Sequence, residues 1–315
     1  MEPIFLKPIY KHVIWGGNNI SRILERDVVG DDIGESWEIS THPGRESIIE
    51  NIDSKEKDLS ELFNDKEKRK AIFGSHCEGL DRFPILVKFI DANDNLSIQV
   101  HPNDEYAIKN EHDVGKDEVW YVVDCEENAQ IIYGFKENIT YENLKDSIDN
   151  NIENSVEYLN VQKGDVIVIP SGVVHAIMKG VFICEVQQNS DITYRVYDWD
   201  RIDKDGKPRI LHKEKALDVI RLDKENKIDN YIDLKEDKNI YNSDKFNIDI
   251  VTICGDKEYI SNNESFYAYI VIEGSGKLQT DNFSKNISKG DSFIIPATLG
   301  KYSFCGNLKL IKSWI

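Results

Sequence analysis

Residues 164–175 read GDVIVIPSGVVH, and the rest of the chain is organised around them. The first two residues form a turn, because glycine accepts positive φ and aspartate bonds its own backbone. The β-branched run Val166–Ile169 predicts a short buried strand, which Pro170 ends. Gly172 turns the chain again, and a hairpin-like return would carry His175 into the mouth of a β-barrel. A histidine there can bind a metal, although a single histidine is more often a core residue.

The turn–strand–proline pattern occurs twice. Residues 289–296 read KGDSFIIP and match KGDVIVIP at 163–170, at a constant offset of 126 residues. Two β units that share this pattern predict a duplicated barrel. At the same offset, Lys301 stands where His175 stands in the first copy. We therefore expect the second copy to serve structure without a metal.

The remaining patterns predict a mainly β protein with two jelly-roll β-barrel units and a few helices. Strands are expected over residues 8–10, 15–18, 34–40, 84–90, 96–102, 118–123, 181–187, 193–197, 248–253 and 266–272. Helices are expected over residues 60–70, 140–159 (one helix or a pair) and 212–222. The glycines at 274–276 predict a tight connection. The charged stretch 223–244 predicts a boundary or surface excursion, so we divide the chain into a metal-binding domain with helical insertions (1–235) and a metal-free domain (236–315).

Composition restricts the class of protein and its partners. The chain has 315 residues, 40% of them hydrophobic, which suffices for a large core. No stretch approaches the ~20 apolar residues of a membrane helix, and the N-terminus lacks the pattern of a signal peptide. A net charge of −18 argues against nucleic acid and anionic membranes as partners. We expect a cytoplasmic monomer or homodimer with five reduced, widely spaced thiols: Cys77, Cys125, Cys184, Cys254 and Cys305.

Candidate metal ligands come from three predicted strands. Gln99 and His101 are two residues apart, so both side chains emerge on one face of their strand, which Ser97 shares. Glu118 opens the following strand, and His175 is the third contribution. Two imidazoles, a carboxylate and an amide oxygen can surround one divalent ion and leave a position open. Each residue alone has a plain structural explanation, but together they favour a metal site.

Cations near these candidates suit an anionic substrate. Lys88 lies within an apolar strand, where a charge needs a partner. Lys116 can reach the same mouth, although taken alone it would be a solvated lysine. Arg195 either pairs with Asp191 or Asp198 or binds a ligand, and its aromatic surroundings favour binding. A guanidinium suits a phosphate or an enediolate oxygen because it offers a charged, planar pair of donors.

Several blocks together resemble one family. The pattern G-x5-P-x-G-x2-H (164–175) resembles the second signature of the cupin superfamily. The blocks LSIQVHP (96–102), GKDEVWYV (115–122), PSGVVHA (170–176) and EVQQNSDITYRVYDW (185–199) resemble type I mannose-6-phosphate isomerases. IWGG (14–17) and GESWEIS (34–40) are similar to the short bacterial form. The resemblance spans essentially the whole chain, in order.

The resemblance implies site roles for matching positions. It implies one Zn²⁺ per chain, held by Gln99, His101, Glu118 and His175. Arg195 matches the family's active-site arginine. Ser97 and Lys116 match residues beside the sugar phosphate, with Lys116 as a second catalytic cation, and Lys88 matches a lysine near the metal.

The implied reaction interconverts mannose 6-phosphate and fructose 6-phosphate. A proton leaves C2, an enediol forms, and the proton returns at C1, with zinc as the Lewis acid. Arg195 would stabilise the enediolate or hold the phosphate. The base stays open among a zinc-bound water, Glu118, Lys116 and other groups.

Two other functions are compatible with the predicted fold. One is a metal-dependent cupin oxygenase, and the other is a non-catalytic sugar-phosphate sensor. The usual first cupin signature, H-x-H with a nearby glutamate, is here Gln99-Val100-His101 with Glu118 further along. That departure fits the isomerase family, and together with Lys116 it argues against the oxygenase.

Overall fold

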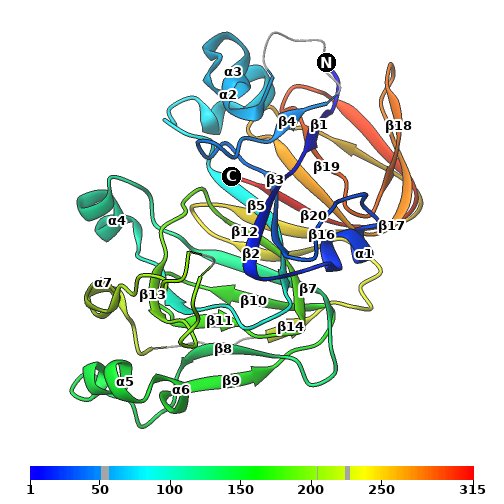
Figure 1. Ribbon diagram of the computed structural model, residues 1–315. Helices are drawn as coiled ribbons and strands as arrows, with labels where there is room; N and C mark the ends of the chain where they lie inside the picture. Colours follow the sequence, from blue (N-terminus) through cyan, green and yellow to red (C-terminus); the bar gives the residue numbers. More distant parts are fainter. Residues whose placement is uncertain (51–56, 204, 224–227) are drawn as a thin grey trace.

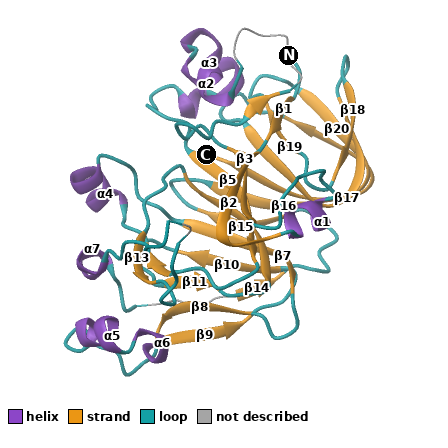
Figure 2. Cartoon of the chain, viewed as in Figure 1, coloured by secondary structure: helices purple, strands orange, loops and turns teal. Residues whose placement is uncertain are grey.

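Strands dominate the computed structural model, which describes residues 1–50, 57–203, 205–223 and 228–315 (Figures 1 and 2). The described strands form three sheets with eight, seven and five members. The predicted mainly β class is confirmed. No helix among the described residues has the length and apolar character needed to cross a bilayer.

Two of the sheets pack face to face around the candidate site. The seven-stranded sheet has the order β14 (Ile228–Asn230), β10 (Asp165–Ile169), β7 (Glu118–Cys125), β12 (Val181–Gln188), β5 (Ile85–Ala92), β3 (Ile33–Ile39) and β2 (Ile9–Gly17). The five-stranded sheet has the order β13 (Tyr194–Tyr197), β6 (Ile98–Val100), β11 (His175–Ile177), β8 (Gln130–Phe135) and β9 (Val156–Asn160). One buried cluster contains Trp120 and Ile183 from the first sheet and Ile131 and Ile177 from the second. The two sheets therefore close over a common core.

The third sheet combines the C-terminal strands with the N-terminus of the chain. Its order is β15 (Lys238–Asn242), β16 (Asn247–Ile260), β20 (Lys301–Trp314), β17 (Tyr267–Gln279), β19 (Ser292–Ile295), β1 (Ile4–Lys7) and β4 (Ile48–Ile49), with β18 (Ser284–Ser288) paired to β17. Aromatic side chains fill its concave side, and the hydroxyls of Tyr269 and Tyr302 are hydrogen-bonded at 2.9 Å. The first strand of the chain is thus built into the C-terminal sheet.

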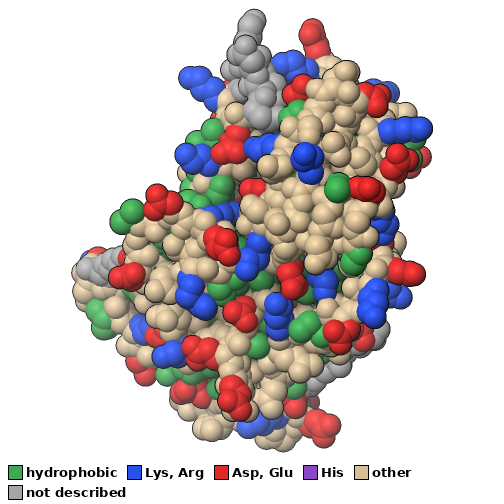
Figure 3. Space-filling model, turned by 90° about the vertical axis from the view of Figure 1, so that its right-hand side faces the viewer, with side chains coloured by type: hydrophobic (Ala, Val, Ile, Leu, Met, Phe, Trp, Pro, Cys, Tyr) green, Lys and Arg blue, Asp and Glu red, His purple; other side chains and the backbone are tan. Residues whose placement is uncertain are grey.

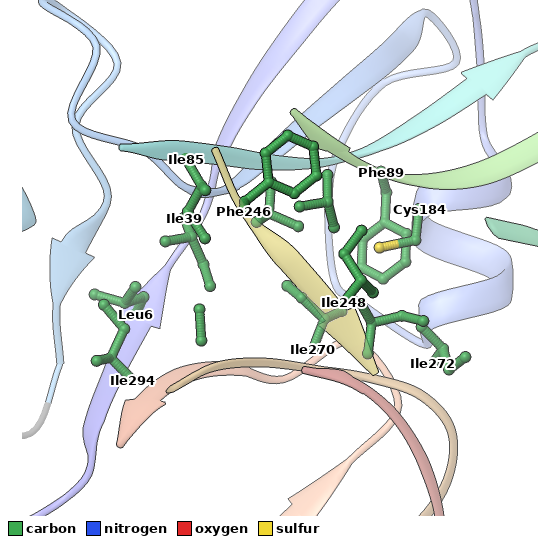
Figure 4. Packing of buried hydrophobic residues seen from close by; sticks show 14 of the residues in the cluster. Leu6, Ile39, Ile85, Phe89, Cys184, Phe246, Ile248, Ile270, Ile272 and Ile294 are labelled. Carbon is green, nitrogen blue, oxygen red and sulfur yellow. The ribbon is translucent and has the colours of Figure 1, made fainter. Parts of the chain in front are cut away.

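The seven-stranded sheet is the middle layer of the molecule (Figure 1). Figure 4 shows Ile39, Ile85 and Phe89 of this sheet packed against side chains of the third sheet such as Ile248 and Ile270. All eight residues of β5 and of β12 are buried. Burial on both faces explains why these strands are nearly continuous apolar runs.

The described helices are short and lie outside the sheets. They are α1 (Asn19–Leu24), α2 (Leu59–Asn64), α3 (Lys66–Phe73), α4 (Asp104–Glu111), α5 (Leu144–Asn150), α6 (Ile152–Ser155) and α7 (Lys213–Val219), with a 3₁₀ turn η1 (Ser75–Cys77). Helices α4 to α7 gather at one edge of the molecule (Figure 2). The helix expected over 60–70 is divided at Asp65, whose side chain accepts hydrogen bonds from the backbone of Glu67 and Lys68 and starts a second helix.

The expectations for residues 140–159 and for the return at Pro170 are wrong in detail. The apolar spacing over 140–159 gives a helix pair, but its last residues form β9, because Val156 continues a strand beside β8. The hairpin-like return at Pro170 is a crossover, since β10 and β11 belong to different sheets. Part of the 223–244 excursion lies outside the described residues, and its remainder contains β14 and β15.

The glycines at 274–276 lie inside β17 and do not form a tight connection. Gly274 has φ +83°, and a Cβ there would lie 2.0 Å from the carbonyl oxygen of Asn307 on β20. The glycine therefore permits close approach of two long strands beside a bulge between Val271 and Glu273.

Candidate metal centre and active-site cavity

Three buried side chains converge between the two facing sheets. One ligand atom each from His101, Glu118 and His175 lies within 4.8 Å of the other two. His101 follows β6, His175 begins β11, and Glu118 begins β7 of the opposite sheet. His175 and Gln99 are directly paired across β11 and β6, which places them on one face. The sequence prediction thus named residues that the fold brings together.

Both histidines are held with one nitrogen toward the centre. His101 Nδ1 lies 2.8 Å from the carbonyl oxygen of Ile192, and His175 Nδ1 lies 2.9 Å from that of Val173. A carbonyl can only accept, so each Nδ1 carries the proton and each Nε2 keeps its lone pair. Burial lowers the pKa of both imidazoles, to about 3 for His175, where His101 adds to the effect. Neutral imidazoles of this kind are ready to bind a metal.

Glu118 supplies the negative charge. Its Oε1 lies 2.7 Å from Lys116 Nζ and 3.2 Å from His101 Nε2, and its Oε2 accepts a 3.0 Å hydrogen bond from the indole of Trp120. Burial alone would raise the pKa of Glu118, but Lys116 and the histidines outweigh it and hold that pKa well below its usual range. Despite its close contacts, Oε1 makes no hydrogen bond of normal geometry to a described residue. The buried, anionic carboxylate lies 3.2 Å from Nε2 of His101 through Oε1 and 3.8 Å from Nε2 of His175 through Oε2, an arrangement that fits a divalent cation.

Gln99 lies beside this trio. Its Nε2 is 3.4 Å from His175 Nε2, and its Oε1 accepts a 3.2 Å hydrogen bond from the hydroxyl of Ser97. The two ends of an amide are interchangeable by rotation about its last bond. Rotation would turn the amide oxygen toward His175 Nε2, so Gln99 can offer a fourth ligand atom.

A cavity of about 300 Å³ opens beside the centre. Gln99, Ser97, Lys88, Lys116 and Arg195 all lie on its wall. The sequence reasoning missed other polar residues of this wall, namely Lys11, Glu35, Glu185, Thr193, Arg209 and His212, and treated Asp191 only as a pairing partner. Lys116 is buried, so the expectation of a solvated lysine, which its position alone suggested, is wrong.

Glu185 is the buried carboxylate that links Lys88 to the centre. It lies 3.4 Å from Lys88 Nζ and accepts a 2.9 Å hydrogen bond from the indole of Trp120, which Glu118 shares. Burial and the charge of Glu118 raise the pKa of Glu185 to about 7. A lone glutamate in the apolar run VFICEV was the signal in the sequence that could have identified it.

Arg195 lies on β13, where its guanidinium is fixed by one hydrogen bond from Nη1 to the carbonyl of Ile210 (2.9 Å). Its Nε is buried and has no hydrogen-bond partner among the described residues. The carboxylates considered as partners are otherwise engaged, Asp191 with Arg45 and Asp198 with Arg209 and Arg201. Because Arg195 lines the cavity and forms no ion pair with a carboxylate among the described residues, its guanidinium is available to a ligand.

Over its full length the chain is similar to curated bacterial isomerases. It is 39% identical over 322 aligned residues to the putative mannose-6-phosphate isomerase YvyI of Bacillus subtilis. The alignment covers 100% of this chain and 99% of that protein. The chain belongs to the type I phosphomannose isomerase family. The mannose-6-phosphate isomerase of Streptococcus mutans is 35% identical, with 99% of this chain and 98% of that protein covered.

Further comparisons agree with membership of the type I phosphomannose isomerases. The description "Phosphomannose isomerase type I, catalytic domain" matches residues 4–142, and "Mannose-6-phosphate isomerase, cupin domain" matches residues 236–315. The crystal structure of the mannose 6-phosphate isomerase from Bacillus subtilis superposes with a TM-score of 0.89 at 38% identity, with both chains covered completely.

Proposed function

We propose that this chain is a zinc-dependent isomerase that interconverts mannose 6-phosphate and fructose 6-phosphate through an enediol. The observation that carries the metal dependence is the buried trio His101, Glu118 and His175, with its two oriented imidazoles and its anionic carboxylate. Nitrogen and oxygen ligands in this number suit zinc with an open position. When bound, zinc would supply the Lewis acidity that polarises the sugar oxygens.

The side chains around the cavity suit the remaining steps of an aldose–ketose isomerisation. The reaction needs a group that moves a proton between C2 and C1 and donors that stabilise the developing oxyanion. Lys116 and Glu185 line the cavity and are candidates for moving the proton, together with Glu118. Arg195 and Lys116 bring the positive charge that favours an enediolate or a phosphate. Ser97 and Lys88 complete the proposed substrate-binding wall.

We also propose that the chain consists of two cupin units, 1–235 and 236–315. The strand order β10–β7–β12–β5 in the seven-stranded sheet is repeated as β19–β17–β20–β16 in the third sheet, which supports a duplication. The second unit lacks the metal ligands. Lys301, at the sequence position that corresponds to His175, is exposed, and the buried Tyr302 beside it takes part in the aromatic filling.

A coupled assay tests the proposed function. Purified protein is incubated with mannose 6-phosphate, and fructose 6-phosphate is detected. Chelation should abolish the activity, zinc should restore it, and elemental analysis should find one zinc per chain. Full activity in metal-free protein would contradict the zinc dependence, and iron in place of zinc would favour a cupin oxygenase. Ligand binding without turnover would identify a sensor.

Location and assembly stay predictions. All five cysteines are free in the structure, which agrees with a reducing compartment such as the cytoplasm. Acidic and basic side chains are interspersed over the face in Figure 3. We propose a small sugar phosphate as partner, and a monomer or homodimer as the working form.

A further inference from the structure

The positive charges of the cavity fall into two groups. Its three lysines each face a carboxylate at 3.4 Å or less: Lys11 with Glu35, Lys88 with Glu185, and Lys116 with Glu118. The carboxylates offset part of the charge of these lysines. They reduce the net positive charge that this part of the wall offers to an incoming dianion.

The arginines near Asp198 are not each paired with a carboxylate of their own. Arg209 and Arg201 share one carboxylate, Asp198, through hydrogen bonds of 2.7 Å from Arg209 Nε and 2.7 Å from Arg201 Nη2. Arg201 has one further, longer contact, 3.7 Å to Asp94. Arg195 lies with Arg209 on the wall of the cavity, and burial together with the charges of Arg209 and Arg201 lowers the pKa of Arg195. Arg195 forms no ion pair with a carboxylate among the described residues, although the charges of Asp198 and Asp203 act on it, and its Nε has no hydrogen-bond partner there.

Arg195 and Arg209 lie at a defined place relative to the metal centre. Arg195 on β13 is paired with Gln99 on β6, and Gln99 is paired with His175 on β11. Directly paired residues share a face, so the three side chains form a row across the sheet. Two strand spacings separate the ends of the row, which is roughly 10 Å. A hexose 6-phosphate reacts at C1 and C2 and carries its phosphate at the opposite end, so the arginine end of the row suits the phosphate.

The segment before α7 fixes Arg209 beside Arg195. Arg195 donates to the carbonyl of Ile210, and the backbone N–H of His212 donates to the carbonyl of Arg195 at 2.7 Å. Arg209 is therefore attached to β13 through its own chain neighbours as well as through Asp198. Asp198 engages two of the five N–H donors of Arg209. Among the described residues, no other side chain is hydrogen-bonded to the rest.

We propose that Arg209 binds the phosphate group of the substrate together with Arg195, and that Asp198 positions Arg209 for this contact. The proposal rests on the proposed isomerase function and names the residue that selects a phosphorylated sugar over a free one. Arg209 and Arg195 both line the cavity, whereas Arg201, which binds the same carboxylate, does not. That difference gives a matched control within the chain.

The test compares Arg209→Met with Arg201→Met in the zinc-loaded protein. Each variant removes one guanidinium from Asp198, but only the first removes a cavity donor. We expect Arg209→Met to lower kcat/KM for mannose 6-phosphate on the order of 10- to 100-fold, the value of one charged hydrogen bond, chiefly through KM. Calorimetric affinity for inorganic phosphate should fall by a similar factor, and Arg209→Lys should recover part of it.

The control separates phosphate binding from a purely structural role. Arg201→Met should keep phosphate affinity and KM close to those of the wild type. Equal losses in the two methionine variants, or an unchanged Arg209→Met, would overturn the proposal. Thermal melting identifies a variant that fails to fold. Arg209→Lys then carries the test: a folded lysine variant with phosphate affinity below that of the wild type supports the proposal, and one with unchanged phosphate affinity and KM overturns it. A wild-type protein that binds phosphate but does not isomerise would refute the proposed function alone.

Discussion

In the metal-free protein, Glu118 is one half of a buried ion pair. Its side chain is 1% exposed, that of Lys116 is 5% exposed, and Oε1 lies 2.7 Å from Nζ. Glu118→Gln keeps the size of the side chain and removes its charge, which leaves the ammonium of Lys116 buried. Removing one partner of a buried pair costs about 3–5 kcal/mol. We expect a loss near 3 kcal/mol in the free energy of unfolding, because the charge of Glu185 continues to stabilise Lys116.

The assay is urea-induced unfolding of chelator-treated protein, with zinc content measured separately on reloaded samples. The double variant Lys116→Met/Glu118→Gln is the control, because it removes the isolated ammonium that the single variant creates. It should recover most of the lost stability, since a buried pair can often be replaced by uncharged side chains without a penalty. Neither variant should retain stoichiometric zinc, because both lack the carboxylate ligand.

A loss of less than about 1 kcal/mol in the unfolding free energy of Glu118→Gln would refute the buried ion pair, since Lys116 would then be in contact with solvent or another anion. A double variant no more stable than the single one would also contradict it. Stoichiometric zinc in Glu118→Gln would show that the carboxylate is not a ligand. Stability and zinc content thus test separate statements about the same side chain.

Two further predictions concern the cavity wall. Arg195→Ala should lower kcat by roughly 10²- to 10³-fold, the usual effect of losing one donor to a developing oxyanion, and wild-type turnover by this variant in the coupled assay would disprove the role. The pKa of Glu185 rises from 4.5 to about 7 on folding, so between these values the folded protein holds a proton that the unfolded chain has lost, and stability falls as pH rises through this window. Glu185→Gln copies the protonated carboxyl. The unfolding free energy of its metal-free form should therefore match that of the wild type at pH 4.5 and exceed it by about 3 kcal/mol well above pH 7. Identical pH profiles of the two proteins in denaturant titrations would contradict this.

The candidate metal ligands could be named from the sequence because they lie in local patterns. Gln99 and His101 share a strand face through a spacing of two, and His175 follows a turn–strand–turn pattern that has few structural alternatives. Their convergence is a property of strand pairing, which the sequence does not contain. The crossover at Pro170 illustrates this limit: the turn residues are where they were expected, but β10 and β11 belong to different sheets.

Arg209 and Glu185 show what local patterns miss. Arg209 lies in an irregular segment with no periodicity, and its place beside Arg195 depends on Asp198 and on the backbone of Ile210. Glu185 is a single charge in an apolar run, and its partners, Lys88 and Trp120, come from two other strands. Such contacts arise only when the sheets are assembled.

Strand pairing also explains why the repeated strand motif is not accompanied by a second cluster of metal ligands among the described residues. In the first unit the pair Gln99–His175 faces the centre, whereas in the third sheet the pair Ile260–Lys301 is exposed and the neighbouring pair Tyr259–Tyr302 faces the aromatic filling. A shift of one residue along a strand moves a side chain to the other face. A histidine at position 301 would therefore point into solvent, and one at position 302 would find tyrosine rings in place of a carboxylate. The motif specifies a turn and a strand, and the metal depends on what the facing sheet contributes.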